Sequence, residues 1–182
     1  MKALILAIIP IALIALLCAA AAVERPAAEP DPGLKNLVQV CIVCRDVEAT
    51  SKLWAAALGV DAPSIKTTRP GHDVHVVYRG KESTGQAKIA TMRLGQVGLE
   101  LLQPVGPDTA WREFLDKNGE GVHHVAFSIV DVDKTLKRFD SLGMPVLHRG
   151  RLDGDNGDYM YIDSQKPLGV TLEFLHRDAA AK

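Results

Sequence analysis

The chain has 182 residues, of which 47% are hydrophobic and 24% charged, with 15 glycines and 10 prolines. This composition excludes a disordered tail, a collagen and a coiled coil, and the length suits one globular domain. The 21 lysines and arginines against 22 aspartates and glutamates leave a net charge of −1, so no basic surface is expected to bind nucleic acid.

The first 22 residues have the pattern of a signal peptide. Lys2 precedes an apolar run over residues 3–17, and the alanine-rich end suits signal peptidase. We therefore expect residues 1–22 to be removed on export to the periplasm or the outside, which leaves no membrane attachment. Two alternatives stay open. An uncleaved leader is long enough to anchor the protein in a bilayer, and Cys18 is a lipid-attachment candidate that bulky Leu17 disfavours.

Residues 23–36 are rich in proline and have no hydrophobic periodicity. Such a segment predicts a stiff, solvated linker that takes no part in a core. One folded domain is then expected over residues 37–177.

The first predicted strand, LVQVCIVC from Leu37, contains Cys41 and Cys44 in a C-x-x-C spacing. That spacing also occurs in redox dithiols and in half of a zinc site. Because side chains alternate between the faces of a strand, residues three apart point in opposite directions. We therefore interpret the two cysteines as small, buried hydrophobic side chains.

A repeat with an offset of 85 residues organises the rest of the chain. The segment QVCIVCRDVEATSKLW, which starts at Gln39, aligns with HVAFSIVDVDKTLKRF, which starts at His124, and each is followed by Leu-Gly. Each copy predicts a strand, an aspartate helix cap (Asp46 and Asp131), an amphipathic helix and a glycine stop.

Three strand-like stretches follow each helix. They are HDVHVVYRG, KIATMRL and VGLELLQP in the first copy, and MPVLHRG, DYMYID and GVTLEFLHR in the second. The last strands also align with each other, so the repeat covers whole modules. The predicted fold class is α+β, with βαβββ modules at residues 37–106 and 119–177. A helix over residues 107–118, capped by Asp108, joins them.

Four isolated polar residues occupy equivalent strand positions in the two modules. Gln39 corresponds to His124 on the first strands, and Glu100 corresponds to Glu173 on the last strands. Burying a polar group without a partner costs about 1–3 kcal/mol, and one divalent cation would partner all four. Two carboxylates, an amide oxygen and an imidazole suit a five- or six-coordinate Zn, Mn, Co, Ni or Fe ion. We predict these four residues as its ligands.

The other histidines lack such counterparts. Strand alternation directs His123 to the opposite face from His124, either in a second layer around the site or at the surface. The remaining four are expected in loops or at the surface: His72, His75, His148 and His176.

Strand alternation also predicts a small, mostly apolar wall around the four polar residues. The side chains expected to face this cavity are Cys41, Val43, Gly98, Leu102, Ala126, Ser128, Thr171 and Leu175. The loop at residues 150–157 is glycine-rich and acidic, which suits a mobile rim or a plain surface turn. Three cations are candidates to receive an anionic substrate: Lys88, Arg93 and Arg151.

Several stretches resemble the vicinal oxygen chelate superfamily, which includes glyoxalase I, methylmalonyl-CoA epimerase, extradiol dioxygenases and bleomycin-resistance proteins. They are LVQVCIVCRDVEATSKLWAAALGV, GLELLQP, WREFLDKNGEGVHHVAFSIVDVD and GVTLEFL, within residues 37–176. The resemblance implies two modules curled into a half-open mixed β cup, with Gln39, Glu100, His124 and Glu173 as metal ligands. The Gln/Glu/His/Glu set resembles one branch of glyoxalase I, and its single histidine disfavours iron-dependent ring cleavage.

The same resemblance implies a metal-dependent isomerase, epimerase or lyase that moves a proton next to a carbonyl, through an enediolate or enolate bound at the metal. Glu173 is the expected base, with Glu100 as ligand or second proton carrier. Coenzyme A and glutathione thioesters are cytoplasmic substrates, however, whereas the leader predicts export. A non-catalytic small-molecule binding protein and a purely structural metal remain alternatives. Unpaired backbone groups at exposed strand edges favour homodimer formation, which the sequence leaves open.

Overall fold

The computed structural model describes residues 33–179. The predicted leader at residues 1–22, including Cys18, and most of the predicted linker lie outside the described residues. Within residues 33–179, no helix combines the length and the hydrophobicity needed to span a bilayer.

Two copies of the predicted module form the framework. The first consists of β1 (Leu37–Val43), α1 (Val47–Leu58), β2 (Ile65–Thr67), β5 (Gln86–Leu94) and β6 (Val97–Val105). The second consists of β7 (Gly121–Ile129), α3 (Val132–Ser141), β8 (Val146–Arg151), β9 (Gly157–Ile162) and β10 (Thr171–Arg177). The remaining elements are η1 (Gly71–Val74), β3 (Val77–Tyr78), β4 (Lys81–Glu82), α2 (Ala110–Asn118) and α4 (Gln165–Leu168).

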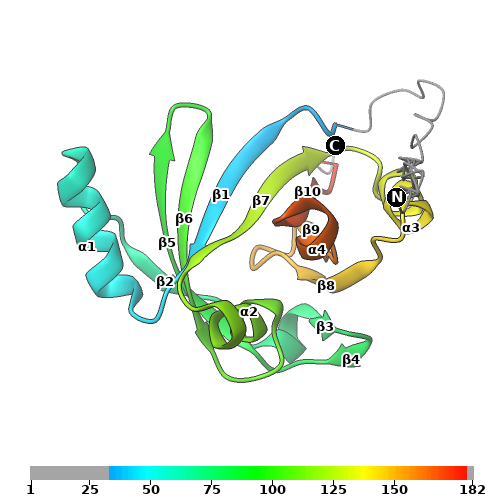
Figure 1. Cartoon of the computed structure of the whole chain (residues 1–182), viewed down its shortest axis with the longest axis horizontal. Coiled ribbons are helices and arrows are strands. Elements are labelled where there is room, and N and C mark those ends of the chain that lie inside the picture. Colours follow the sequence, from blue (N-terminus) through cyan, green and yellow to red (C-terminus); the bar gives the residue numbers. More distant parts are fainter. Residues whose placement is uncertain (1–32, 180–182) are drawn as a thin grey trace, which may run out of the picture.

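All strands join one curled, mixed sheet in the order β2-β5-β6-β1-β7-β10-β9-β8-β3-β4. The first strands of the two modules, β1 and β7, pair antiparallel at its centre, and Val40 lies opposite Val125, its own counterpart in the repeat. This pairing relates the modules by a pseudo-twofold axis. The helices α1 and α3 lie at opposite ends of the curled sheet, and α2 lies below it (Figure 1).

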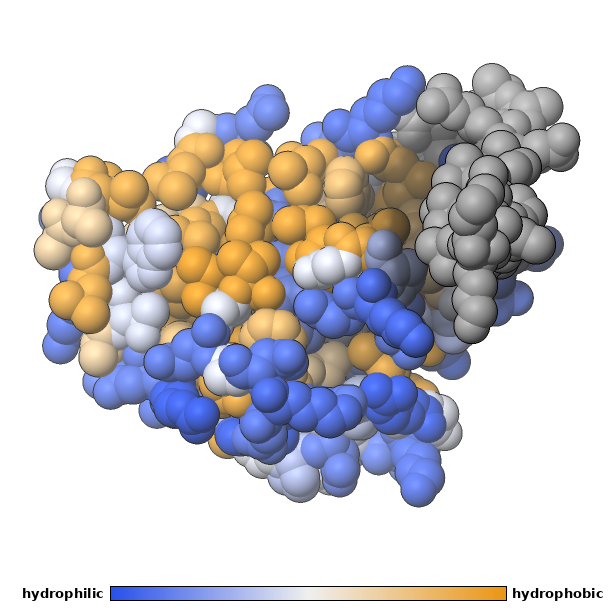
Figure 2. All heavy atoms as spheres, viewed as in Figure 1, coloured by the Kyte–Doolittle hydropathy of each residue, from blue (hydrophilic) through white to orange (hydrophobic). Residues whose placement is uncertain are grey.

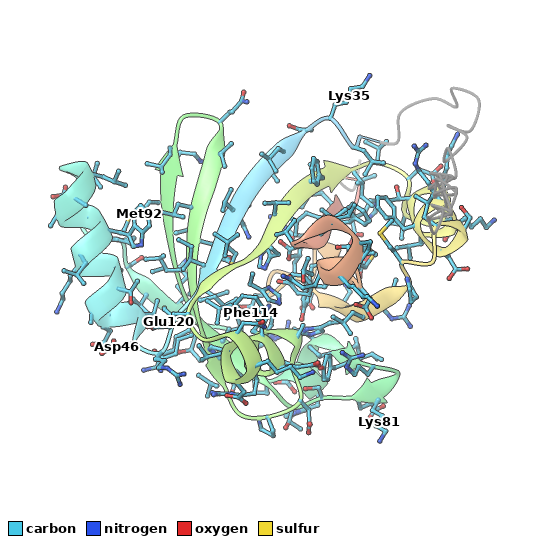
Figure 3. The ribbon with its side chains drawn as sticks, viewed as in Figure 1. Lys35, Asp46, Lys81, Met92, Phe114 and Glu120 are labelled. Carbon is cyan, nitrogen blue, oxygen red and sulfur yellow. The ribbon has the colours of Figure 1, made fainter. Side chains whose placement is uncertain are left out.

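The helix caps follow the sequence pattern. The Asp46 carboxylate accepts hydrogen bonds from the backbone N–H groups of Glu48 and Ala49 at the start of α1. The Asp131 carboxylate accepts one from the Lys134 N–H at the start of α3. Gly59 ends α1 in a left-handed conformation, with φ 68°. Figure 3 labels Asp46 next to Glu120, whose carboxylate accepts a hydrogen bond from the Arg45 N–H at 2.7 Å.

The cap of the linking helix differs from the expectation. Thr109, not Asp108, is the N-cap of α2, and its hydroxyl accepts a hydrogen bond from the Arg112 N–H. Asp108 instead takes a left-handed backbone conformation, with φ 56°, in the turn before the helix. The helix therefore begins one residue later than an aspartate cap would place it.

The sequence predicted HDVHVVYRG as a strand of the first module, and this prediction is wrong. The short strand β2 takes that place, and the stretch instead forms η1 and the β3–β4 hairpin, which pairs with β8 of the second module. Residues 68–85 thus connect one half of the sheet to the other. Gly71 permits a close approach on this path, since a Cβ atom there would lie 2.3 Å from the Ser83 carbonyl oxygen.

The core has three parts. Apolar side chains of α1 pack on β5 and β6, and those of α3 pack on the second half of the sheet, where the Phe139 and Phe174 rings are 4.9 Å apart. The helix α2 closes the floor of the cup with Trp111 and Leu115. Figure 2 shows hydrophobic residues gathered over α1 and the central strands, and hydrophilic residues over α2 and the β3–β4 hairpin.

Candidate active site

The four residues predicted as metal ligands come together inside the cup. The Nε2 atom of His124 lies 3.2 Å from Oε2 of Glu173 and 3.7 Å from Oε1 of Glu100. The Nε2 atom of Gln39 lies 3.3 Å from Nε2 of His124 and 3.4 Å from Oε2 of Glu173. His124 has no exposed surface, and the side chains of Glu100 and Glu173 are only 12% and 5% exposed.

Strand pairing explains this convergence. Both β6 and β10 run parallel to the first strand of their own module, and β1 runs antiparallel to β7 about the pseudo-twofold axis. Residues in equivalent places therefore point to the same concave side from opposite modules. The amide of Gln39 presents its oxygen to a cation after half a turn about its last bond.

A cavity of about 270 Å³ opens above these residues. Of the predicted wall residues, Leu102 and Leu175 line it, whereas Cys41, Val43 and Ala126 are completely buried. Sequence reasoning missed three aromatic side chains that also line it: Trp111, Tyr159 and Tyr161. Alternation along DYMYID was an available signal for the two tyrosines, because Tyr161 is the neighbour of Glu173 across the β9–β10 pair.

Three arginines line the mouth of the cavity. The guanidinium of Arg69 donates to Oδ2 of Asp155 at 2.8 Å, in the turn between β8 and β9, so this turn is tied to the opposite side of the mouth. Arg151 binds Asp178 at 2.7 Å, and Arg177 donates to the side-chain oxygen of Asn156. Of the cations expected to receive an anion, Arg151 lines this cavity, whereas Lys88 and Arg93 do not.

His123 lies in a second layer around the site and not at the surface, because it is 1% exposed. Its Nδ1 atom is 2.8 Å from Nδ1 of His124. The register of β1 and β7 shifts between Cys41 and Ile42, which leaves His123 without an opposite residue. Such a bulge breaks strict alternation and lets the two imidazoles meet. When His124 donates this hydrogen bond, its Nε2 lone pair faces the carboxylates.

His148 and His176 are not in loops, contrary to the expectation. His148 is completely buried on β8, with its ring 4.8 Å from that of Trp111 and its Nε2 atom 3.4 Å from the Tyr159 hydroxyl. His176 is half-buried on β10. Helix α2 packs over β8 and covers His148, a contact that local sequence does not reveal. His72 and His75 are exposed in and after η1, as expected.

Burial perturbs the ionisable groups of the site. It raises the pKa of Glu100 to about 7, and the charge of Glu173 adds to this rise while His124 opposes it. Burial also raises the pKa of the Cys41 thiol and lowers the pKa of His123. Negative charge on Glu100 is therefore costly in the protein alone, and a cation would offset that cost.

The donor set fits a divalent metal ion. Ligand atoms of Cys41, Glu100 and His124 all lie within 4.8 Å of one another, and Gln39 and Glu173 adjoin His124. Imidazole, carboxylate and amide donors suit the transition metals predicted from the sequence.

A second acidic group consists of Asp158, His176 and Asp178. The guanidinium of Arg151 already contacts both of its aspartates, at 3.3 and 2.7 Å. This group is therefore an ion-pair cluster and not a competing metal site.

The chain is similar in sequence and in fold to several epimerases. An ethylmalonyl-CoA/methylmalonyl-CoA epimerase from Cereibacter sphaeroides is 27% identical over 63% of this chain and 76% of its own length. A 2-epi-5-epi-valiolone epimerase from an Actinomyces species is 26% identical over 82% of this chain and 84% of its own length. A variant of Streptomyces coelicolor methylmalonyl-CoA epimerase, solved in complex with 2-nitronate-propionyl-CoA, superposes with a TM-score of 0.56 and 25% identity, over 79% of this chain and 98% of that one.

The family model described as Glyoxalase/Bleomycin resistance protein/Dioxygenase superfamily matches residues 38–161. This range includes both halves of the central β1–β7 pair and three of the four converging polar residues. The chain therefore belongs to the glyoxalase/bleomycin resistance protein/dioxygenase superfamily.

Proposed function

We propose that this protein is a metal-dependent isomerase or epimerase that moves a proton on a carbon next to a carbonyl group. The single observation that carries this proposal is the pair Glu100 and Glu173. They come from opposite modules, and their oxygens lie 3.7 and 3.2 Å from the same nitrogen of His124. Epimerisation needs one group to remove a proton from one face of a carbon and another to return a proton to the opposite face. Two carboxylates related by a pseudo-twofold axis suit that task.

A divalent ion held by Gln39, Glu100, His124 and Glu173 would supply Lewis-acid stabilisation of the negative charge that develops on the substrate oxygen. Zinc, nickel, cobalt, manganese and iron all suit this donor set. The buried walls of the cup exclude water from the reacting carbon. We keep Glu173 as the base for the first proton transfer and assign Glu100 to the return of the proton.

The cavity supports a small substrate with an anionic or carbonyl-rich end. Its volume of about 270 Å³ holds the reacting part of such a molecule. Arg177 at the mouth, which donates to the neutral side chain of Asn156, favours an anion. The related epimerases act, by their names, on acyl-CoA thioesters and on a valiolone. Short acyl thioesters and small 2-oxo compounds are therefore the first substrates to test.

Solvent-deuterium exchange tests the proposal. Metal-loaded protein is incubated in deuterated buffer with methylmalonyl-CoA and a set of small 2-oxo acids, and loss of the proton next to the carbonyl is followed by NMR. We expect Glu173→Gln and Glu100→Gln to slow exchange by about 100-fold or more, the usual contribution of one acid or base. Glu82→Gln, at an exposed position of β4, is the matched control and should exchange like the wild type.

Two results would contradict the assignment. Exchange at the wild-type rate in both Glu100→Gln and Glu173→Gln would remove the carboxylates from the reaction. Tight binding of a compound without exchange in the wild type would favour the non-catalytic binding protein. Metal content is measured for each variant by elemental analysis, so that loss of the ion is separated from loss of the base.

We further propose that the protein acts after export, because residues 1–22 have the pattern of a cleavable leader. The intact mass of protein recovered from the periplasm or medium tests this. A mass that retains the leader would support the membrane-anchored alternative. Size-exclusion chromatography with light scattering on the same sample determines whether the protein forms the homodimer that the sequence leaves open.

A further inference from the structure

We propose that Cys41 supplies a sulfur ligand to the metal ion of the candidate site, which makes the site selective for thiophilic ions. The inference rests on the proposed metal dependence and extends it. None of the four residues predicted as ligands contains sulfur. A sulfur ligand would change which ions the site prefers and how firmly it holds them.

The position of Cys41 in the sheet is the first argument. It belongs to β1, and this strand runs between β6 and β7 (Figure 1). Its partner on β6 is Glu100, and its partner on β7 is His124. The three residues therefore form one row across the concave face, and their ligand atoms lie within 4.8 Å of one another.

The second argument is an asymmetry between the modules. The counterpart of Cys41, 85 residues later, is Ala126, which lies between Gln39 and Glu173 in the equivalent row. Both Cys41 and Ala126 are completely buried. Because alanine occupies the equivalent position of the second module, packing at this position requires only a small side chain and no sulfur. The sulfur of Cys41 adds a donor atom to one row only.

The third argument concerns the surroundings of the thiol. The sulfur of Cys41 lies within 4.8 Å of a carboxylate oxygen of Glu100 and of a ring nitrogen of His124, so it faces the polar centre of the cup. Cys44, the other cysteine within residues 33–179, is unlike it, because Cys44 packs in the apolar cluster beneath α1. Complete burial also keeps Cys41 from solvent oxidants and from disulfide formation.

Coordination of the ion by sulfur is accompanied by loss of the thiol proton. The thiol of Cys41 gives up one proton to the buffer as its sulfur binds the ion. Sulfur, imidazole and carboxylate donors together favour zinc, cobalt and cadmium over magnesium and manganese. The expected ion is therefore softer than the ion that a site with only oxygen and imidazole ligands would select.

Cobalt spectroscopy tests this directly. The protein is stripped with a chelator and titrated with Co²⁺, and the near-ultraviolet sulfur-to-cobalt charge-transfer band is recorded together with the visible cobalt bands. We expect the charge-transfer band in the wild type and in Cys44→Ala, which is the matched control. We expect Cys41→Ala to lack it and to keep the visible bands. Cys41→Ala introduces the residue that the second module has at the equivalent position, Ala126.

Competition between metals gives a second readout. Cys41→Ala is expected to weaken Cd²⁺ binding and to leave Mn²⁺ binding nearly unchanged. The loss for Cd²⁺ should be about tenfold or more, since removing even a residue that only orients a ligand costs that much. X-ray absorption of the zinc-loaded wild type needs no variant. It should show a zinc–sulfur distance of about 2.3 Å, so the test remains available if Cys41→Ala does not fold.

The outcomes separate this inference from the proposed function. Bound cobalt without a charge-transfer band in the wild type, or a band that persists in Cys41→Ala, would overturn the role of Cys41 and leave the metal site standing. Absence of any cobalt binding would overturn both the role of Cys41 and the metal dependence.

Discussion

Replacing Glu100 by glutamine should make the stability of the metal-free protein less sensitive to pH. Glutamine keeps the shape of the side chain and removes the ionisable group. Burial is the main reason that the pKa of Glu100 rises from 4.5 to about 7 on folding. At 1.36 kcal/mol for each pKa unit, this rise corresponds to about 3 kcal/mol.

The sign follows from proton binding. Between pH 4.5 and 7 the folded wild type keeps the Glu100 proton while the unfolded chain loses it. The free energy of unfolding of the wild type therefore falls as the pH rises through this range, and Glu100 contributes no further change above pH 7. Glu100→Gln lacks this contribution. Relative to the wild type, the variant should gain about 3 kcal/mol between pH 4 and pH 8.

The assay is urea unfolding in the presence of a chelator, followed by tryptophan fluorescence at several pH values. Glu82→Gln is the control, because its exposed carboxylate should leave the pH profile unchanged. A difference between Glu100→Gln and the wild type that stays constant from pH 4 to pH 8 would refute the burial argument. Excess divalent metal should reverse the order of stability at pH 8, because an ion that binds the native carboxylate stabilises the wild type.

Two further predictions concern the core and the second layer of the site. Phe174→Ala should lower the free energy of unfolding by about 3–5 kcal/mol, because the ring is completely buried against α3. Urea unfolding measures this loss, and a change below 1 kcal/mol would contradict tight packing there. His123→Ala should weaken metal binding by about 10–100-fold, because it removes the hydrogen bond that orients His124. Metal competition with a chromophoric chelator measures the affinity, and wild-type affinity would exclude this orienting role.

The repeated module and the convergence of the four polar residues were predictable from sequence. Strand alternation assigns each residue to a face, and the constant offset of 85 between Gln39 and His124 sets equivalent places in the two copies. The aspartate caps were also predictable, since the carboxylate of Asp46 accepts hydrogen bonds from backbone groups just two and three residues away. These features depend on local pattern and on duplication, both of which are visible in a single chain.

Features that depend on contacts between distant segments were not predictable in this way. The β3–β4 hairpin pairs with β8 across about 70 residues of chain, and its two-residue strands show no alternation. The bulge on β7 brings His123 to His124, although strict alternation separates them. His148 is buried because α2 folds over β8. In each case the partner lies far away in the sequence or the regular period is broken, so the packed fold alone sets the environment of the side chain.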